Sequence, residues 1–301
     1  ELNEAFMAAK KYDPTSTVEK HLLRKKKRKL LYHPAEKIGT IIVDHFPSLG
    51  RIVALRFLEW VQKNPGGVVS LPTGKTPEYF IKYTSHLLQN WHKQKTQTLL
   101  KEYGIDPGIT PDMKSLHFVQ IDEFYPIDPS QHNSFHYYVE KYYLKEFGLD
   151  PDKALLINCN QIGLPRNKEL QDIWPGGEVD LSLRFRHPEN KLEQSRKHLL
   201  EEIDEWCYEY GEKIRTLGGI GFFLGGIGPD GHIAFNVRGS DHHCNTRLTP
   251  INYETQATSA SDLGGIEVAR KRHAITIGLE TITNNPTCTA IIFAAGEAKA
   301  A

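Results

Sequence analysis

The chain has 301 residues, and its 37 Lys and Arg residues balance its 37 Asp and Glu residues. This balance excludes a strong overall field that would attract nucleic acid or an anionic membrane, so any anionic ligand must be captured locally. A hydrophobic fraction of 39% and a mean hydropathy of −0.46 indicate a chain that buries a core, and they exclude a disordered or fibrous protein.

Signals for membrane insertion or secretion are missing from the sequence pattern. No stretch approaches the roughly 18 consecutive apolar residues of a membrane span, and the N-terminal segment lacks an apolar run followed by a small-residue cleavage site. Widely spaced cysteines with no CxxC pair are typical of a reduced compartment. We therefore expect a cytoplasmic protein with no membrane partner. Its cysteines are Cys159, Cys207, Cys244 and Cys288.

Residues 1–35 are predicted to be a polar N-terminal arm with the basic run Arg24–Lys29. Such a run occurs in nuclear-localisation and nucleic-acid patches, but leucine pairs flank it on both sides. We favour a solvated, partly helical arm that docks through these leucines, with no nucleic-acid partner. Residues 36–301 are expected to form one α/β domain. No helix follows its last predicted strand, so we expect the domain to be truncated at its C-terminus.

Strands and helices alternate through this domain. A helix is predicted over Phe46–Gln62 from apolar residues at helical spacing, and a strand over Val68–Leu71 follows a Pro-Gly-Gly turn. A loop then leads into a second helix near Pro77, because Pro suits the first turn of a helix. The later predicted elements are strand Leu116–Ile121, helix Ser134–Phe147, strand Ala154–Ile157, helix Lys191–Glu212, strand Ile220–Leu224, strand Ala274–Gly278 and strand Thr289–Ala294.

This alternation predicts a Rossmann-like three-layer α/β/α fold with a mainly parallel sheet. In such folds ligands bind at the carboxyl ends of the strands. The loops that follow the strands are therefore the places to look for chemistry.

The first of these loops contains Thr73, Gly74, Lys75 and Thr76, between two prolines. Gly74 lets backbone N–H groups approach an anion, the following helix N-terminus adds partial positive charge, and Lys75 adds a cationic donor. We expect a phosphate here, although a tight turn with a threonine cap is the alternative.

The same loop ends like the Walker A motif of nucleotide-binding proteins. That motif needs Gly five residues before Gly74, and the residue there is Val69. A P-loop ATPase is therefore disfavoured.

Two further loops carry groups suited to proton transfer. Asp122-Glu123-Phe124-Tyr125 follows a predicted buried strand, where a carboxylate can act as a general base. Gly225–Asn236 contains four glycines and a proline, and places Asp230 two residues before His232, so that the carboxylate can orient the imidazole. A structural Asp–His contact is the alternative interpretation of this pair.

Histidines elsewhere raise the question of a metal. His132 and His136 have helical i, i+4 spacing, and the run Asp241-His242-His243 gathers three possible ligands. The first pair lacks the intervening Glu of a zinc protease, and the second lacks an evident further ligand. We therefore predict no metal.

The three loops, in this order, resemble the glucosamine-6-phosphate deaminases and their superfamily, which includes the 6-phosphogluconolactonases. The resemblance runs from about Glu36 to the C-terminus, and Gly228–Asn236 is its most discriminating part. Lactonases share the Asp-Gly-His core, whereas the Ile-Ala-Phe-Asn sequence that follows it and the Asp-Glu-aromatic loop favour the deaminases.

The resemblance implies catalytic roles for three residues. Asp122 would move a proton between C2 and C1 of the open-chain amino sugar, and His232, oriented by Asp230, would assist ring opening. Phosphate would be bound by Thr73, Gly74, Lys75, Thr76 and Lys299, and Arg247 matches an arginine that some members use for an allosteric phosphate. Family members tend to form oligomers, so a homo-oligomer is an expectation. The resemblance also implies that no metal and no organic cofactor are needed.

Two departures from the family pattern predict weak or altered activity. The family's deaminases place a glutamate directly after Phe-Asn, where this chain has Val237. A second phosphate-binding arginine is expected within Ala257–Gly265, which contains none. Losing one positioned acid–base partner costs roughly ten- to a thousandfold in rate.

The leading hypothesis is an enzyme, of the hydrolase or isomerase class, that converts glucosamine 6-phosphate to fructose 6-phosphate and ammonia. That activity belongs to amino-sugar metabolism, in the breakdown of N-acetylglucosamine. The alternatives are a 6-phosphogluconolactonase-like hydrolysis on the same fold and a non-catalytic sugar-phosphate sensor.

Overall fold

The computed structural model describes residues 12–25, 38–228 and 230–296. They divide into two compact units: the described residues within 1–65 and 77–113 form one, and those within 66–76 and 114–301 form the other. Most of the basic run and Lys299, the residue that the resemblance assigns to phosphate, lie outside the described residues.

The first unit is helical. Its described helices are α2 (Thr17–Lys25), α3 (Phe46–Lys63), α4 (Glu78–Gln89) and α5 (Gln94–Glu102). Helix α3 confirms the helix predicted from residue 46. It packs closely on α4: a Cβ added to Gly50 would lie 2.4 Å from Cβ of Tyr79, and the rings of Phe57 and Phe80 meet edge to face at 5.6 Å. Gly50 is therefore needed for this helix pair.

A buried charged network attaches α2 to α3. The carboxylate of Glu59 accepts hydrogen bonds of 2.6 Å from the N–H of Thr17 and from the hydroxyl of Ser16, at the first turn of α2. Arg56, also buried, pairs with Asp13 at 2.6 Å. Buried charges are tolerated when they are paired and hydrogen-bonded in this way.

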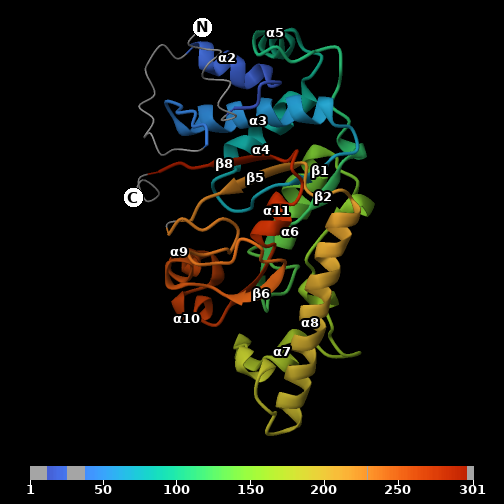
Figure 1. Ribbon diagram of the computed structural model, residues 1–301, viewed down its shortest axis with the longest axis vertical. Helices are drawn as coiled ribbons and strands as arrows, with labels where there is room; N and C mark the ends of the chain where they lie inside the picture. Colours follow the sequence, from blue (N-terminus) through green and yellow to red (C-terminus); the bar gives the residue numbers. More distant parts are fainter. Residues whose placement is uncertain (1–11, 26–37, 229, 297–301) are drawn as a thin grey trace. The chain divides into compact units, whose positions relative to one another are not determined.

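The second unit contains a five-stranded sheet with the order β4-β2-β1-β5-β8, in which every pair of neighbours is parallel. The strands are β1 (Val68–Ser70), β2 (His117–Val119), β4 (Ala154–Leu155), β5 (Phe222–Gly226) and β8 (Thr289–Phe293). Figure 1 shows β1, β2, β5 and β8 side by side. The predicted class, a Rossmann-like three-layer α/β/α fold with a mainly parallel sheet, is confirmed.

The strand order places the topological switch point at β1. The chain proceeds from β1 to β2 on one side and reaches β5 on the other side only later. In open parallel sheets of this kind, ligands bind outside the carboxyl ends of the strands at such a point. The loops after β1, β2 and β5 therefore emerge at one edge.

A second, three-stranded sheet was not expected from the sequence. Strands β3 (Asp122–Tyr125), β7 (His273–Thr276) and β6 (Arg247–Pro250) are antiparallel, in the order β3-β7-β6. The prediction that residues 122–125 are a loop was wrong. The side chain of Gln120 explains the change of sheet, because it accepts from the N–H of Ile157 and donates to the carbonyl of Asp122, both at 2.9 Å, where the chain leaves the parallel ladder.

Helices pack around both sheets of this unit, and α9 and α10 lie beside β6 (Figure 1). The core contains aromatic and branched residues from β1, β3, β5, β7 and α8. The helices are α6 (Phe135–Val139), a π-helical segment (Glu140–Lys145), α7 (Leu170–Ile173), α8 (Lys191–Thr216), α9 (Tyr253–Leu263), α10 (Ile266–Ala269) and α11 (Leu279–Thr283), with 3₁₀ turns at Met113–Ser115, Pro151–Lys153, Cys159–Gln161, Pro175–Gly177 and Leu181–Arg184.

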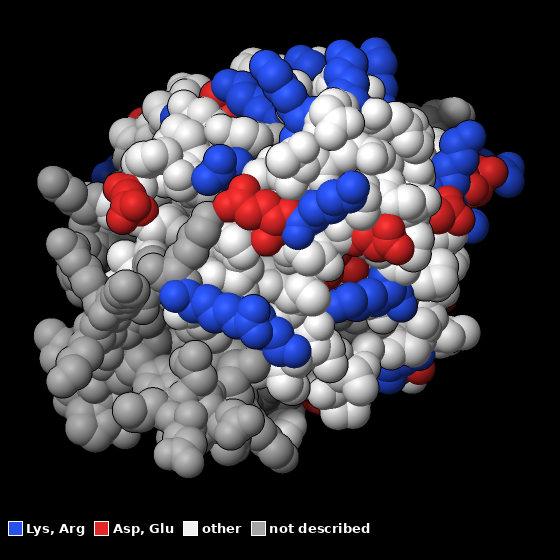
Figure 2. Space-filling model, turned by 90° about the horizontal axis from the view of Figure 1, so that it is seen from above, with Lys and Arg blue, Asp and Glu red and all other residues white. Residues whose placement is uncertain are grey.

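The surface carries both signs of charge. Figure 2 draws one face, on which Lys and Arg side chains are interspersed with Asp and Glu side chains among uncharged residues. Among the described helices, none combines the length and the apolar character that crossing a membrane requires.

Candidate active site

The loop after β1 has the geometry of an anion cradle. Gly74 has φ +90°, a conformation that favours glycine. Two tyrosines fix the loop from behind: the hydroxyl of Tyr138 donates to the carbonyl of Gly74 at 2.9 Å, and that of Tyr143 donates to the carbonyl of Pro72. Within the described residues, the N–H groups of Gly74 and Lys75 make no hydrogen bond. The loop carbonyls are thus engaged by tyrosine hydroxyls, while these N–H groups are available to a ligand. A loop of this kind is suited to bind a phosphate.

The ammonium of Lys75 reaches α9. It lies 3.4 Å from the carboxylate of Asp262, and the two side chains are 83% and 57% exposed. An exposed pair of this kind contributes little to stability, so Lys75 remains available to a ligand.

Asp122 is the first residue of β3 and is buried, with 8% of its surface exposed. Burial, reinforced by the neighbouring charge of Glu123, raises the pKa of its carboxyl from 3.8 to about 8. A carboxyl that titrates near neutral pH has the properties of a general base.

Glu123, its neighbour, has a structural role. Its carboxylate accepts from the hydroxyl of Ser134 and the N–H of His136, both at 2.7 Å, and from the N–H of Phe135 and Phe124 at 3.0 and 2.9 Å. Burial raises its pKa to about 7, and these four donors oppose that rise. Glu123 therefore fixes the start of α6 to the strand that carries Asp122.

The loop after β5 brings Asp230 and His232 together as the sequence predicts. Nδ1 of His232 lies 2.5 Å from Oδ1 of Asp230, and both side chains are about 15% exposed or less. Burial raises the pKa of Asp230, but the charge and hydrogen bond of His232 outweigh it, so that the pKa lies below its usual range. A Cβ on Gly228 would lie 2.2 Å from the imidazole, so only glycine fits there.

Asn252 is a site residue that the sequence analysis missed. Its Nδ2 donates to Oδ2 of Asp230 at 2.6 Å, while its Oδ1 accepts from the N–H of Thr255 at 3.1 Å and so caps α9. An asparagine before a helix is a recognisable cap, but nothing in the sequence connects it with Asp230.

Thr276 connects the elements that carry Asp122 and His232, and it was also missed. It stands opposite Asp122 in the β3–β7 pair, and its buried hydroxyl accepts from the N–H of Phe235 at 3.1 Å. The ring of Phe235 lies 6.1 Å from that of His232 at an angle of 15°, and 5.5 Å from that of Phe124. The predicted base and the predicted acid–base pair therefore belong to one packed assembly.

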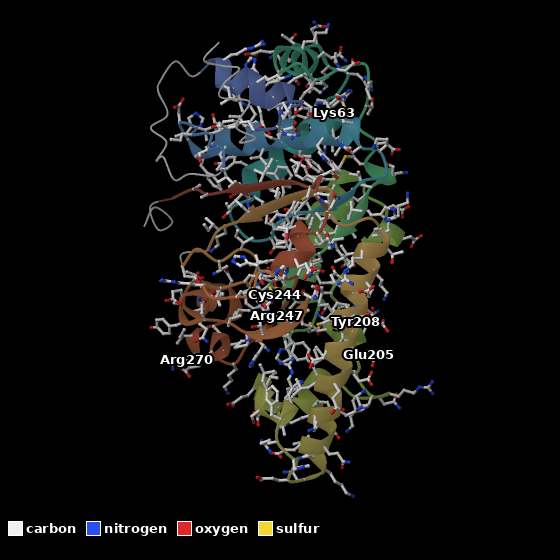
Figure 3. All side chains as sticks on the ribbon, in the orientation of Figure 1. Lys63, Glu205, Tyr208, Cys244, Arg247 and Arg270 are labelled. Atoms are coloured by element: carbon white, nitrogen blue, oxygen red, sulfur yellow. The ribbon has the colours of Figure 1, made fainter. Side chains whose placement is uncertain are left out.

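Arg247, predicted as a possible allosteric residue, contacts the same loop from β6. Its Nη1 donates to Oδ1 of the buried Asn236 at 2.9 Å, and the thiol of Cys244 lies 3.3 Å from the same oxygen. Figure 3 shows Cys244 and Arg247 beside one another. Asn236 in turn donates to the carbonyl of Ile277 at 3.0 Å, which anchors the loop to the end of β7.

No cluster of three or more metal-ligating side chains occurs among the residues that the structure describes. His132 precedes α6 and His136 lies within it, so the two do not share one helix as their spacing suggested.

Val237, at the position of the family's glutamate, is half-buried beside Asn236.

Curated relatives carry a common name. The glucosamine-6-phosphate deaminase of Bacillus velezensis is 25% identical over 263 residues, which cover 87% of this chain and 84% of that enzyme. Glucosamine-6-phosphate deaminase 2 of Bacillus subtilis is 24% identical over 86% of this chain and 81% of its own length. The resemblance to glucosamine-6-phosphate deaminases is confirmed. The deaminase of Caenorhabditis elegans is 38% identical over 102 residues, which cover 33% of this chain and 38% of that enzyme.

Solved structures share the fold. A monomeric glucosamine-6-phosphate deaminase superposes with a TM-score of 0.60 at 21% identity, covering 86% of this chain and 82% of that chain. The 6-phosphogluconolactonase of Leishmania guyanensis superposes with a TM-score of 0.52 at 14% identity, covering 86% and 81%. No family model matches the chain.

Proposed function

We propose that this chain is a glucosamine-6-phosphate deaminase-like enzyme that converts glucosamine 6-phosphate to fructose 6-phosphate and ammonia in the cytoplasm. The observation that carries the proposal is the assembly at the sheet edge, in which a buried carboxyl with a pKa near 8 is linked through Thr276 and Phe235 to a His–Asp pair. The likeness to curated deaminases over most of the chain supports it.

The substrate phosphate binds at the loop after β1. The open amides of Gly74 and Lys75 and the ammonium of Lys75 replace its water shell, with Thr73 and Thr76 beside them. Lys299 is a further proposed phosphate ligand, and Arg247 a proposed contact for an allosteric phosphate. Anchoring the phosphate fixes the sugar carbons, so binding energy away from the reacting atoms positions them.

Proton transfer then follows in two places. His232, held by Asp230, takes the proton of the C1 hydroxyl and gives a proton to the ring oxygen, so that the bond between C1 and the ring oxygen breaks and the aldehyde forms. Asp122 takes the proton from C2, the electron pair forms the C1–C2 double bond of an enolamine, and the proton returns to C1. The product is a ketimine at C2, water adds to that carbon, and ammonia leaves as fructose 6-phosphate forms.

Ammonia release from glucosamine 6-phosphate by the full chain tests the proposal. We expect release together with formation of fructose 6-phosphate. Acid formation from 6-phosphogluconolactone without ammonia would instead support a lactonase, the alternative that the shared fold keeps open. Calorimetric binding of glucosamine 6-phosphate without any turnover would support a sensor.

Asn252→Asp provides a prediction about the His–Asp pair. Asp caps a helix as well as Asn does, so the free energy of unfolding should change little. The new carboxylate, however, faces the carboxylate of Asp230, to which the amide of Asn252 donates a hydrogen bond in the wild-type chain. We expect kcat for ammonia release to fall about 10- to 100-fold, and the pKa of Asp230, followed by NMR, to rise.

Asn252→Ser is the matched control for that substitution. It keeps a cap and removes the donor without adding charge, so its effect on kcat should be smaller. An Asn252→Asp variant with unchanged kcat would contradict the positioning role of Asn252.

A further inference from the structure

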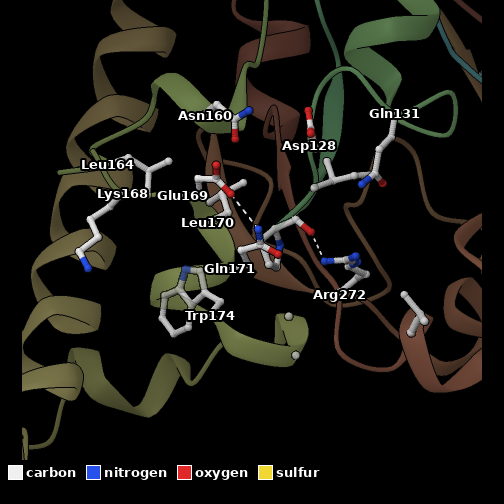
Figure 4. Close-up of a pocket in the computed structure, with 15 residues that line it drawn as sticks. Asp128, Gln131, Asn160, Leu164, Lys168, Glu169, Leu170, Gln171, Trp174 and Arg272 are labelled. Atoms are coloured by element: carbon white, nitrogen blue, oxygen red, sulfur yellow. Dashed lines mark hydrogen bonds between the residues drawn. The ribbon is translucent and has the colours of Figure 1, made fainter. Parts of the chain in front are cut away.

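A cavity of about 630 Å³ lies in the second unit, away from the candidate active site. Its walls are the loop that follows β3, the segment from Asn160 to Trp174, the glycine pair 176–177, and Arg272 just before β7 (Figure 4). We call it the Arg272 pocket. Its size lies within the range of small-molecule sites.

Arg272 is a half-buried cation that forms no ion pair with the described residues. Its Nη1 donates to the carbonyl of Pro126, and its buried Nε has no hydrogen-bond partner among them. No carboxylate oxygen in the described part of the chain lies within 4.0 Å of this guanidinium. Burial lowers the pKa of the group. An oxyanion in the pocket would compensate its charge.

Glycines keep the space beside this guanidinium open. Gly176 and Gly177 both have positive φ, at +75° and +74°. A Cβ added to Gly177 would lie 3.1 Å from Nη1 of Arg272, so a side chain there would press on the guanidinium. At Gly176 and Gly177 the wall of the pocket therefore consists of backbone atoms without side chains.

The other polar groups of the pocket suit hydroxyls. Gln131 and Asn160 are exposed, and their amide groups make no hydrogen bond within the described chain. The carboxylates of the two acids that line the pocket already accept hydrogen bonds: Asp128 from Ser130, and Glu169 from Gln171 at 2.7 Å. Lys168 stands at the edge of the pocket with no ion pair among the described residues (Figure 4).

We propose that the Arg272 pocket binds a small polyhydroxylated molecule that carries one oxyanion group, a phosphate or a carboxylate, with the oxyanion on Arg272. The amides of Gln131 and Asn160 then contact its hydroxyls. This site is separate from the loop of Gly74 and Lys75.

The pocket is connected to Asp122 through the pair of strands β3 and β7. Arg272 immediately precedes β7, and Pro126 immediately follows β3, where Tyr125 stands opposite His273. The indole of Trp174 also donates to the hydroxyl of Tyr125 at 3.1 Å. Asp122 and Thr276 form the other end of the same pair. An anion bound to Arg272 therefore restrains the strand that carries Asp122 and the strand paired with it. This coupling to the catalytic base rests on the proposed function, whereas the binding of the anion does not.

Calorimetric titration of the full chain tests the site without requiring turnover. The ligands are glucose 6-phosphate, gluconate, inorganic phosphate and, as the neutral control, glucose. We expect glucose 6-phosphate, gluconate or both to bind, and glucose not to bind. The phosphate and carboxylate arms identify the oxyanion. Binding of glucose equal to that of the anions, or no heat from any of them, would overturn the proposal.

Three variants determine which site binds the titrated ligand. Arg272→Gln should weaken binding at least tenfold, and Lys168→Glu, a surface change that leaves folding intact, should weaken it severalfold. Lys75→Gln should lower only the part of the phosphate binding that comes from the candidate active site, and should leave gluconate binding unchanged. Loss of binding in Lys75→Gln alone would assign the heat to the active-site loop and reject the pocket. Because none of these outcomes depends on ammonia release, failure of the pocket and failure of the proposed function are distinguishable.

Amide hydrogen exchange measures the coupling. Ligand at a concentration near its wild-type Kd should slow exchange in β3 and β7 of the wild-type chain more than in Lys168→Glu at the same concentration. Unchanged exchange in both strands would show that the pocket is not coupled to Asp122.

Discussion

Asp122→Asn is expected to lower kcat for ammonia release from glucosamine 6-phosphate about 10³-fold and, at the same time, to stabilise the fold at alkaline pH. The loss of activity follows because the amide cannot accept the proton of C2. Asn keeps the size of Asp, so the pairing of β3 with β7 and the packing around residue 122 are retained.

The gain in stability follows from the raised pKa. The Asp122 carboxyl titrates at about 8 in the folded chain and at 3.8 without the fold, so between these values the unfolded chain has lost a proton that the folded chain still holds. Stability from this group is therefore highest below pH 4, falls as pH rises, and is lowest above pH 8. Asn has no proton to lose, and at pH 8.5 it should raise the free energy of unfolding by on the order of a few kcal/mol.

The same pKa predicts the pH dependence of the wild-type rate. Below about pH 8 the carboxyl is mostly protonated and cannot act as a base, so kcat/KM should rise with pH and level off above 8. Denaturant unfolding and initial rates, both measured from pH 5 to 9, provide the two curves. If the ionised carboxylate of Asp122 destabilises the fold but is required for the rate, its position is explained by function rather than by stability.

Two control variants separate this effect from general damage. Asp241→Asn changes an exposed carboxylate that accepts from the N–H of His243, and should alter neither curve. Glu123→Gln should lower stability, because the carboxylate of Glu123 accepts four hydrogen bonds from Phe124 and the start of α6. An Asp122→Asn variant that loses stability, or retains full activity, would contradict the assignment of the base.

Much of the parallel sheet could be predicted because its signals are local. Val68–Leu71 is a short apolar run between a Pro-Gly-Gly turn and the loop at Gly74, and the long helix from Lys191 has its asparagine cap and helical spacing in sequence. The aspartate and histidine at 230 and 232 are two residues apart in a glycine-rich loop, so their contact is almost forced by the chain. Such features need no knowledge of distant partners.

The small antiparallel sheet could not be predicted, because distant pairing decides it. Residues 122–125 are buried on both faces, so they show no alternation of polar and apolar side chains. Their strand exists because β7, which lies far along the chain, aligns with them. Asn252 and Thr276 were missed for the same reason: each has an ordinary local role, as a helix cap and a strand residue, and its second contact is set by the tertiary fold.

His232→Gln is expected to lower kcat about 10²- to 10³-fold. Nδ1 of His232 is occupied by Asp230 and one face of its ring lies on Phe235, so Nε2 is the nitrogen left to meet the sugar; within the described chain it has no partner. Gln can hydrogen-bond from the same place but cannot carry a proton at neutral pH. His242→Gln, which changes an exposed histidine on a neighbouring loop, is the matched control and should keep full activity.

A double-mutant cycle identifies how Asp230 takes part. Asp230 lies 2.5 Å from Nδ1 and acts by orienting and polarising the imidazole, so Asp230→Asn alone should cost about tenfold in kcat, less than the loss of the proton carrier. Once His232 is Gln, Asp230 has nothing to orient. The double variant should therefore match His232→Gln alone rather than show the product of the two effects. Multiplicative losses would mean that Asp230 contacts the substrate directly and that the pair does not work as a unit.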